Sequence, residues 1–125
     1  LYRDKIYNDS FYYVSKFENL LNLIIKNSII SKNIFKNLHE NQNLKKLSLI
    51  KVSINDANIK YISKFKQLER LELTSLKISN KCIKDLAKLK NLKEIKILHT
   101  YIDRKGIKKL KYLHHNKKLK ILFRD

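Results

Sequence analysis

Residues 44–54 read LKKLSLIKVSI, and the pattern returns as LERLELTSLKI (68–78) and again as LKEIKILHTYI (92–102). In each stretch the first leucine is followed three, five and ten positions later by another aliphatic residue. The middle step of two positions places both side chains on one face of an extended strand. Extending the spacing in both directions predicts strands near residues 22–26, 46–50, 70–74, 94–98 and 118–122.

The 24-residue period runs through the whole chain. Seven columns of residues at this spacing hold 36 positions, of which 34 are apolar, whereas a hydrophobic content of 43% would give about 15. One column consists of isoleucine alone: Ile6, Ile30, Ile54, Ile78 and Ile102. The other columns run through Leu113, Leu119 and Ile121 near the end of the chain. The columns predict a layered apolar core to which each period contributes one layer.

The second half of each period has helical spacing. Ile59, Ile62 and Phe65 lie three positions apart, which places them on one helical face. Just before them stands a polar column of helix N-cap residues: Ser31, Asn55, Ser79 and Asp103. A further column, mostly small, precedes the first buried helical residue and predicts a close approach between helix and neighbour: Ser10, Ile34, Asn58, Cys82 and Gly106. Each period therefore predicts a strand, a turn and a capped helix.

The three quoted stretches resemble leucine-rich repeats, whose pattern is L-x-x-L-x-L-x-x-N-x-L. The segments that follow them, NDANIKYISKF, SNKCIKDLAKL and DRKGIKKLKYL, resemble the helical halves of the ribonuclease-inhibitor-like and F-box-associated type. The resemblance implies an α/β solenoid with a curved parallel sheet on the concave side and helices on the convex side. It implies a single domain over 1–125, with full repeats at 20–43, 44–67, 68–91 and 92–115 and partial repeats at both ends.

The chain departs from the family pattern at the ninth position of the repeat. In the family an asparagine or cysteine at this position hydrogen-bonds backbone in the turn. Here the position holds Ser28, Val52, Leu76 and Thr100. The departure bears on the regularity of the turns and not on the fold.

Composition narrows the function classes. The chain has 125 residues, with 29 lysines and arginines against 11 aspartates and glutamates and a formal net charge of +18. No run of about 18 apolar residues is present to cross a membrane, and a single cysteine excludes an internal disulfide and fits a reducing compartment. We expect an intracellular location, cytoplasmic unless a transit peptide precedes Leu1. Because the chain starts with leucine and has no methionine, we expect a piece of a longer protein.

Little in the chain indicates catalysis. Gly106 is the only glycine, so there is no glycine-rich phosphate loop. Cys82 flanks a buried helical column and is interpreted as a structural residue rather than a nucleophile. The histidines do not combine with Cys82 at a metal-ligand spacing: His39, His99, His114 and His115, the last two at a predicted helix end. The sequence predicts no enzyme, no metal and no cofactor.

The concave face is the predicted partner site. A solvated sheet face should be polar, yet apolar residues recur at its outward positions, and charged residues between them would set the register of a bound protein segment. The predicted contact residues are Tyr2, Ile24, Ile50, Arg70, Glu72, Thr74, Glu94, Lys96, Leu98 and Leu122. Phe123 is expected nearby.

The basic charge offers a second surface. Lysines concentrate in the helical halves, where a convex basic face would attract nucleic acid in a salt-dependent way. The predicted contacts are Lys84, Lys88, Lys105, Lys108, Lys109 and Lys111. Arginine is scarce, and A/T-rich codons account for part of the lysine excess.

Three functions remain open from the sequence. The leading one is a non-enzymatic scaffold that binds another protein within a larger protein or complex. The second is a basic structural subunit of a ribonucleoprotein that contacts RNA. The third is the substrate-recognition part of an F-box-type ubiquitin ligase adaptor, which would need an F-box upstream of Leu1.

Overall fold

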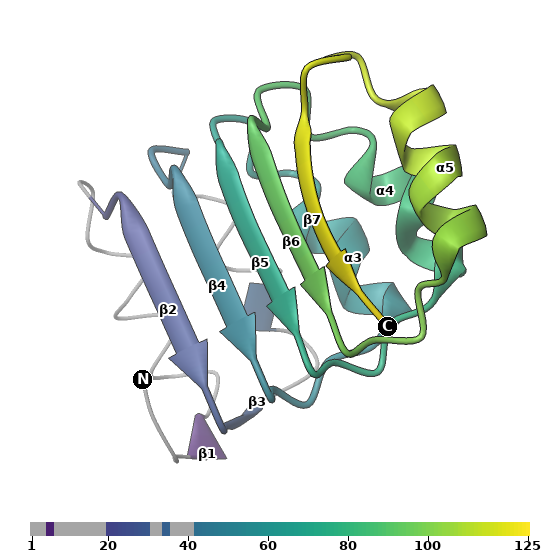
Figure 1. The fold of residues 1–125 in the computed structure, drawn as a ribbon. Helices are drawn as coiled ribbons and strands as arrows, with labels where there is room; N and C mark the ends of the chain where they lie inside the picture. Colours follow the sequence, from purple (N-terminus) through teal and green to yellow (C-terminus); the bar gives the residue numbers. More distant parts are fainter. Residues whose placement is uncertain (1–4, 7–19, 31–33, 36–41) are drawn as a thin grey trace.

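Five parallel strands form one sheet. The computed structural model describes residues 5–6, 20–30, 34–35 and 42–125. The sheet consists of β2 (Asn22–Lys26), β4 (Lys46–Ile50), β5 (Arg70–Thr74), β6 (Glu94–Leu98) and β7 (Lys120–Arg124), in chain order (Figure 1). A short parallel pair joins β1 (Lys5–Ile6) to β3 (Ile29–Ile30). Each sheet strand is followed by a crossover to the next, so neighbours in sequence are neighbours in space.

Helices cover one face of this sheet and leave the other open (Figure 1). The helical elements are α3 (Asp56–Ile62), the 3-10 turn η1 (Asn80–Cys82) continuing into α4 (Ile83–Leu86), and α5 (Arg104–Leu113). Asn55, Ser79 and Asp103 cap them, each accepting a backbone N–H from the first turn, as the polar column predicts. Ser31, the fourth predicted cap, lies outside the described residues.

The buried columns meet layer on layer. Leu47 pairs with Leu71, and Leu71 with Ile95, so the register from β2 to β6 follows the period of the sequence. The isoleucine column is inside as predicted at the four members whose burial the structure describes: Ile30, Ile54, Ile78 and Ile102 are 6%, 4%, 0% and 2% exposed. Since a single repeat has no second layer of its own, this stacking is the main source of stability.

The periodic register is wrong at the last strand. The predicted strand at 118–122 lies at Lys120–Arg124, and Glu94 pairs with Lys120 where the period predicts Lys118. Two extra residues enter at the end of α5, where Leu113 is 40% exposed and His114 is fully buried in its place. The buried columns on β7 are therefore Ile121 and Phe123, which are half-buried and pack against the core. Leu119, assigned to the β7 column, instead precedes the strand.

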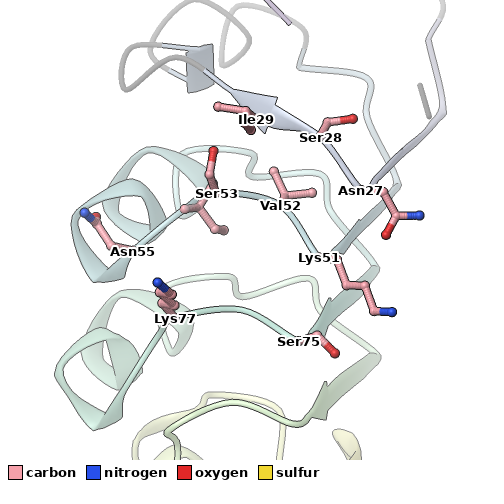
Figure 2. A pocket seen from close by; sticks show the side chains of 10 residues that line it. Asn27, Ser28, Ile29, Lys51, Val52, Ser53, Asn55, Ser75 and Lys77 are labelled. Atoms are coloured by element: carbon pink, nitrogen blue, oxygen red, sulfur yellow. The ribbon is translucent and has the colours of Figure 1, made fainter. Parts of the chain in front are cut away.

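The turns after the strands are regular despite the altered ninth position. Asn27, Lys51, Ser75 and His99 all have φ between 50° and 54°, the left-handed region. In each turn the backbone N–H of this residue donates to the carbonyl that ends the next strand; Lys51 N to Thr74 O, for example, is 3.0 Å. Figure 2 shows Asn27, Lys51 and Ser75 at successive corners of the chain. At two of the altered ninth positions the side chain still bonds the backbone: Ser28 Oγ donates to Lys26 O, and Thr100 Oγ1 accepts from Ile102 N. At the other two, Val52 and Leu76 are buried in the core.

A glycine at a left-handed turn should stabilise the protein. A non-glycine residue in this conformation costs about 1–2 kcal/mol, and glycine loses part of that gain through its freer unfolded chain. We expect Ser75→Gly to raise the free energy of unfolding by about 0.5–1 kcal/mol and Ser75→Val to lower it by more than about 1 kcal/mol. Denaturant unfolding followed by circular dichroism measures both. Shifts of the same sign in the two variants would contradict the expectation.

Candidate functional site

The concave face of the sheet is built from three rows of side chains that the strand register places side by side. Each row takes one residue from each of the five strands. The rows, hereafter the concave face, are Asn22, Lys46, Arg70, Glu94 and Lys120; Ile24, Ser48, Glu72, Lys96 and Leu122; and Lys26, Ile50, Thr74, Leu98 and Arg124. No helix among the described residues covers this face (Figure 1).

The structure brings together nearly all of the predicted contact residues. Ile24 and Leu122 are exposed, at 43% and 38%, and Ile50 and Leu98 are half-buried in the face. Leu122 lies one row from its predicted place because of the shifted register: it pairs with Lys96, and Arg124 pairs with Leu98. Phe123, expected near this face, points toward the core instead. Tyr2 lies outside the described residues.

The carboxylates of the concave face are neutralised from within. Glu72 accepts hydrogen bonds from Ser48 Oγ at 3.2 Å and from Thr74 Oγ1 at 3.3 Å, and Lys96 Nζ lies 3.7 Å from it. Lys120 Nζ lies 3.6 Å from the carboxylate of Glu94. Both acidic side chains are thus held in the sheet by neighbouring strands.

Several cations of the same face keep their charge unpaired. Among the described residues, no carboxylate pairs with Lys46 or Arg70, nor with Lys26 or Arg124 at the strand ends. A hollow of about 180 Å³ lies between apolar and charged side chains of β2, β4, β5 and β6. Its lining is Asn22, Ile24, Lys46, Leu47, Ser48, Arg70, Leu71, Glu72, Glu94 and Lys96. The face therefore offers apolar contacts and free positive charge together.

The carboxylate of Glu69, beside the concave face, is also paired with lysines of neighbouring repeats. Glu69, just before β5, lies 3.3 Å from Lys93 Nζ and 3.4 Å from Lys45 Nζ. The hydrogen bond from Lys93 is the main cause that lowers the pKa of Glu69, and the charge of Lys45 adds to it. Exposed pairs of this kind contribute little to stability, but they fix the positions of the charges along the sheet edge.

A second hollow, of about 600 Å³, lies along the turns that follow β2, β4 and β5 (Figure 2). Its lining consists of hydroxyl, amide, ammonium and aliphatic side chains: Asn27, Ser28, Ile29, Lys51, Val52, Ser53, Ile54, Asn55, Ser75 and Lys77. Two of its hydroxyls bond the backbone: Ser28 Oγ donates to Lys26 O at 2.8 Å, and Ser53 Oγ accepts from Ile30 N at 2.9 Å. These groups hold the turns in place.

Cys82 is part of the core. Its side chain is 1% exposed, and its thiol donates to Ser79 O at 3.1 Å. Burial raises the pKa of the thiol to about 12, and the nearby charge of Asp56 adds to the effect. A thiol that stays protonated at neutral pH is a poor nucleophile, which supports the structural role predicted from the sequence.

The raised thiol pKa predicts a loss of stability at alkaline pH. The thiol of the unfolded chain ionises near its ordinary pKa of 9, whereas the folded thiol stays protonated up to about pH 12. The contribution of Cys82 to the free energy of unfolding is therefore full below about pH 9 and falls as the pH rises toward 12. In this pH range we expect the free energy of unfolding of the wild type to fall, relative to that of Cys82→Ala, by up to about 1.4 kcal/mol per pH unit. Urea unfolding of both proteins at increasing pH measures it; parallel curves would contradict the assignment.

The small-residue column marks a close approach, as predicted, at Gly106. A Cβ on Gly106 would overlap the side-chain amide of Asn80 on the preceding repeat. That amide bonds Asp103: Asn80 Nδ2 donates to Asp103 Oδ1 at 2.8 Å, and Asp103 N donates to Asn80 Oδ1 at 3.1 Å. The N–H of Gly106, followed by Asn80, lowers the pKa of Asp103. Asp103 is thus a cap that also ties two repeats together.

The described histidines occupy different structural positions. His99 occupies a left-handed turn, and His115 is exposed. His114 is the C-cap of α5 and is fully buried. Within residues 5–6, 20–30, 34–35 and 42–125 no three histidine, cysteine or acidic side chains gather as a metal site would require. His39 lies outside these ranges.

The predicted nucleic-acid contacts are all exposed lysines on the helical side. Lys84 lies on α4 and Lys88 just after it, where it pairs with Asp85 at 2.9 Å; Lys105, Lys108, Lys109 and Lys111 lie on α5. Their contact with nucleic acid stays a prediction.

No helix in the described part of the chain has the length and apolar character needed to cross a bilayer.

The solved structures that are similar to this chain include two bacterial proteins. A leucine-rich-repeat protein of Leptospira interrogans matches 90% of it at 24% identity with a TM-score of 0.69. An internalin of Listeria monocytogenes matches 91% at 18% identity with a TM-score of 0.56. The chain spans 27% and 38% of these two proteins. Neither protein's name refers to RNA or to an F-box.

No protein-family model matches the chain, and no curated protein matches it. The fold assignment therefore rests on the structure and these two neighbours. The sheet is parallel and in chain order, the helices lie on one side, and both neighbours are repeat proteins of the same architecture. The chain has the leucine-rich-repeat fold.

Proposed function

We propose that this chain is a non-enzymatic protein-interaction module that binds an extended segment of another protein on its concave face. The observation that carries the proposal is that, within the described residues, a sheet face that no helix covers (Figure 1) combines exposed apolar side chains with cations that no carboxylate neutralises. Ile24 and Leu122 supply apolar contact at opposite edges of the face. Arg70 lies between them, on the central strand.

The charge of the face selects the kind of segment. The concave face carries six basic side chains (Lys26, Lys46, Arg70, Lys96, Lys120, Arg124) and two acidic ones (Glu72, Glu94), a net charge of +4. Because Glu72 and Glu94 are already paired, the unpaired charge is positive. A segment that alternates acidic and apolar residues is complementary to this arrangement.

Arg70 is the proposed anchor of the complex. Its side chain borders the hollow together with Lys46 and Ile24, so a carboxylate of the partner can meet two cations while an adjacent apolar side chain fills the hollow. Arginine binds carboxylates with two parallel hydrogen bonds and is enriched among residues that dominate binding energy.

The test uses acidic–apolar peptides selected against the folded chain from a displayed random library. We expect Ile50→Asp with Leu98→Asp to weaken binding by about 100-fold or more, because two carboxylates are placed in the apolar part of the face. The matched control is Tyr101→Asp with Tyr112→Asp, which adds the same charge at side chains 71% and 80% exposed outside the concave face. Isothermal titration calorimetry measures the dissociation constants.

The outcomes separate the proposal from general charge attraction. Arg70→Glu should shift the selected peptides from acidic toward basic sequences. Equal loss of binding in the concave pair and the control pair would contradict the concave site. Selection of no peptide by the wild type at physiological salt would contradict the proposal as a whole.

A further inference from the structure

A groove lined by lysines lies on another part of the surface. It has a volume of about 550 Å³ and lies where the chain passes from α3 to β5 and from α4 to β6. Its lining, hereafter the lysine groove, is Lys60, Ser63, Lys64, Lys66, Gln67, Lys88, Lys90 and Asn91. None of these residues belongs to the concave face, and Lys88 alone was among the predicted nucleic-acid contacts.

The repeat brings these lysines together. Lys64 and Lys88 occupy the same position in successive repeats, as do Lys66 and Lys90. The two loops have the same backbone bonds: Lys66 N donates to Lys64 O, and Lys90 N donates to Lys88 O, both at 2.9 Å. Asn91 Nδ2 also donates to Lys66 O at 2.7 Å and ties one loop to the next. The groove therefore has a framework fixed by hydrogen bonds.

The charge of the groove is largely uncompensated. Among the described residues, five ammonium groups and no carboxylate line it. Lys88 pairs with Asp85 at 2.9 Å, and Lys64 Nζ lies 5.4 Å from the centre of the Tyr61 ring. In the described part of the chain, Lys60, Lys66 and Lys90 have no ion-pair partner. Like charges held in one cavity repel each other, and a bound anion relieves that repulsion.

Helix electrostatics account for one of the five lysines. Lys60 lies in the last turn of α3, where a cation stabilises the helix dipole. Lys66 and Lys90 lie in the loops beyond the helix ends, outside the reach of that effect. The repeat pattern does not itself require a lysine at these positions, since the next repeat has Tyr112 at the position of Lys88.

We propose that the lysine groove binds a small soluble anion with two or more adjacent phosphate groups. Its volume lies within the range of small-molecule sites, about 300–1,000 Å³. Each ammonium supplies three donors, and the side-chain amide of Gln67 adds neutral ones, whereas the Ser63 hydroxyl already donates to Lys60 O at 2.6 Å. In a nucleic-acid strand a sugar separates successive phosphates, so a linked oligophosphate places more negative charge in the same volume.

The experiment measures binding of inorganic tripolyphosphate to the 125-residue chain by isothermal titration calorimetry at about 150 mM salt. We expect Lys66→Gln with Lys90→Gln to weaken binding by about tenfold or more. The matched control is Lys81→Gln with Lys118→Gln, which removes the same charge from two exposed side chains outside the groove and the concave face and should change binding by less than about twofold. Inorganic phosphate should bind more weakly than tripolyphosphate by about tenfold or more.

Three results would overturn the proposal. One is equal weakening in the groove pair and the control pair, which would show attraction to net charge only. Another is the absence of tripolyphosphate binding even at low salt. The third is binding of single-stranded RNA, but not of tripolyphosphate, that depends on Lys66 and Lys90, which would make the groove a nucleic-acid site. The Ile50→Asp, Leu98→Asp protein should keep tripolyphosphate binding, so failure of the concave site and failure of the groove are distinguishable.

Discussion

Replacing Ile78 by alanine is expected to lower the free energy of unfolding by about 3 kcal/mol or more. Ile78 is fully buried, in the isoleucine column between Ile54 and Ile102. Truncation removes buried methyl groups and leaves a cavity in a layer that has a packed repeat on each side. Because a solenoid's stability is a sum over neighbouring layers, an interior layer weakens two interfaces at once.

Denaturant unfolding followed by circular dichroism measures the Ile78→Ala effect. Tyr101→Ala is the control, since its ring is 71% exposed and a surface change of this kind alters stability by less than about 0.5 kcal/mol. Equal shifts in the two variants would contradict the stacked core on which the fold rests.

Replacing His114 by phenylalanine should lower the free energy of unfolding by about 2–4 kcal/mol, although the side chain keeps its ring and approximate volume. His114 Nε2 lies 2.8 Å from Leu89 O, and Asn116 N donates to His114 Nδ1 at 3.0 Å. These partners assign the neutral tautomer with its proton on Nε2, which donates to the carbonyl. Phenylalanine leaves both backbone groups without that partner, in or next to the core.

The neighbouring histidine provides the matched control. His115 is exposed, so His115→Phe should change the free energy of unfolding by less than about 0.5 kcal/mol in the same denaturant assay. If His114→Phe is as stable as the wild type, the imidazole fills space and its hydrogen bonds carry no net stability.

His114 also shows where the sequence pattern stops being sufficient. The column places Leu113 inside, since leucine at this position of the repeat matches the rest, and a histidine pair at a helix end is ordinarily polar surface. The chain instead buries the residue whose two ring nitrogens bond the loop to Leu89 and Asn116, and exposes Leu113. Periodicity measures hydrophobicity and not hydrogen-bond partners, so the shift of β7 by two positions could not be predicted from it.

Elsewhere the periodic signal was strong enough to predict the fold. Four of the five sheet strands have the predicted bounds, because alternation and spacing together leave one register in which Leu47, Leu71 and Ile95 are all buried. Asn55, Ser79 and Asp103 cap their helices as their side-chain chemistry indicates. The concave rows then follow from the same alternation.

The charge pattern of the surface could be predicted only in part. The sequence shows Glu72 and Glu94 as possible register charges, but their pairing with Lys96 and Lys120 depends on side-chain rotamers and on the shifted β7. The lysine groove depends on loops whose residues have no apolar period. The repeat places Lys66 and Lys90 in neighbouring loops, but only the three-dimensional arrangement shows that both line one cavity.

The left-handed turns have a consequence for how this surface can change over time. Asn27, Lys51, Ser75 and His99 each hold a conformation that glycine adopts more easily, at corners away from the core. A single substitution at any of them can add stability without altering a contact residue. Stability gained at these turns can offset substitutions on the concave face that bind a new partner but destabilise the sheet. The left-handed turns therefore limit how far the concave face can change before the fold is lost.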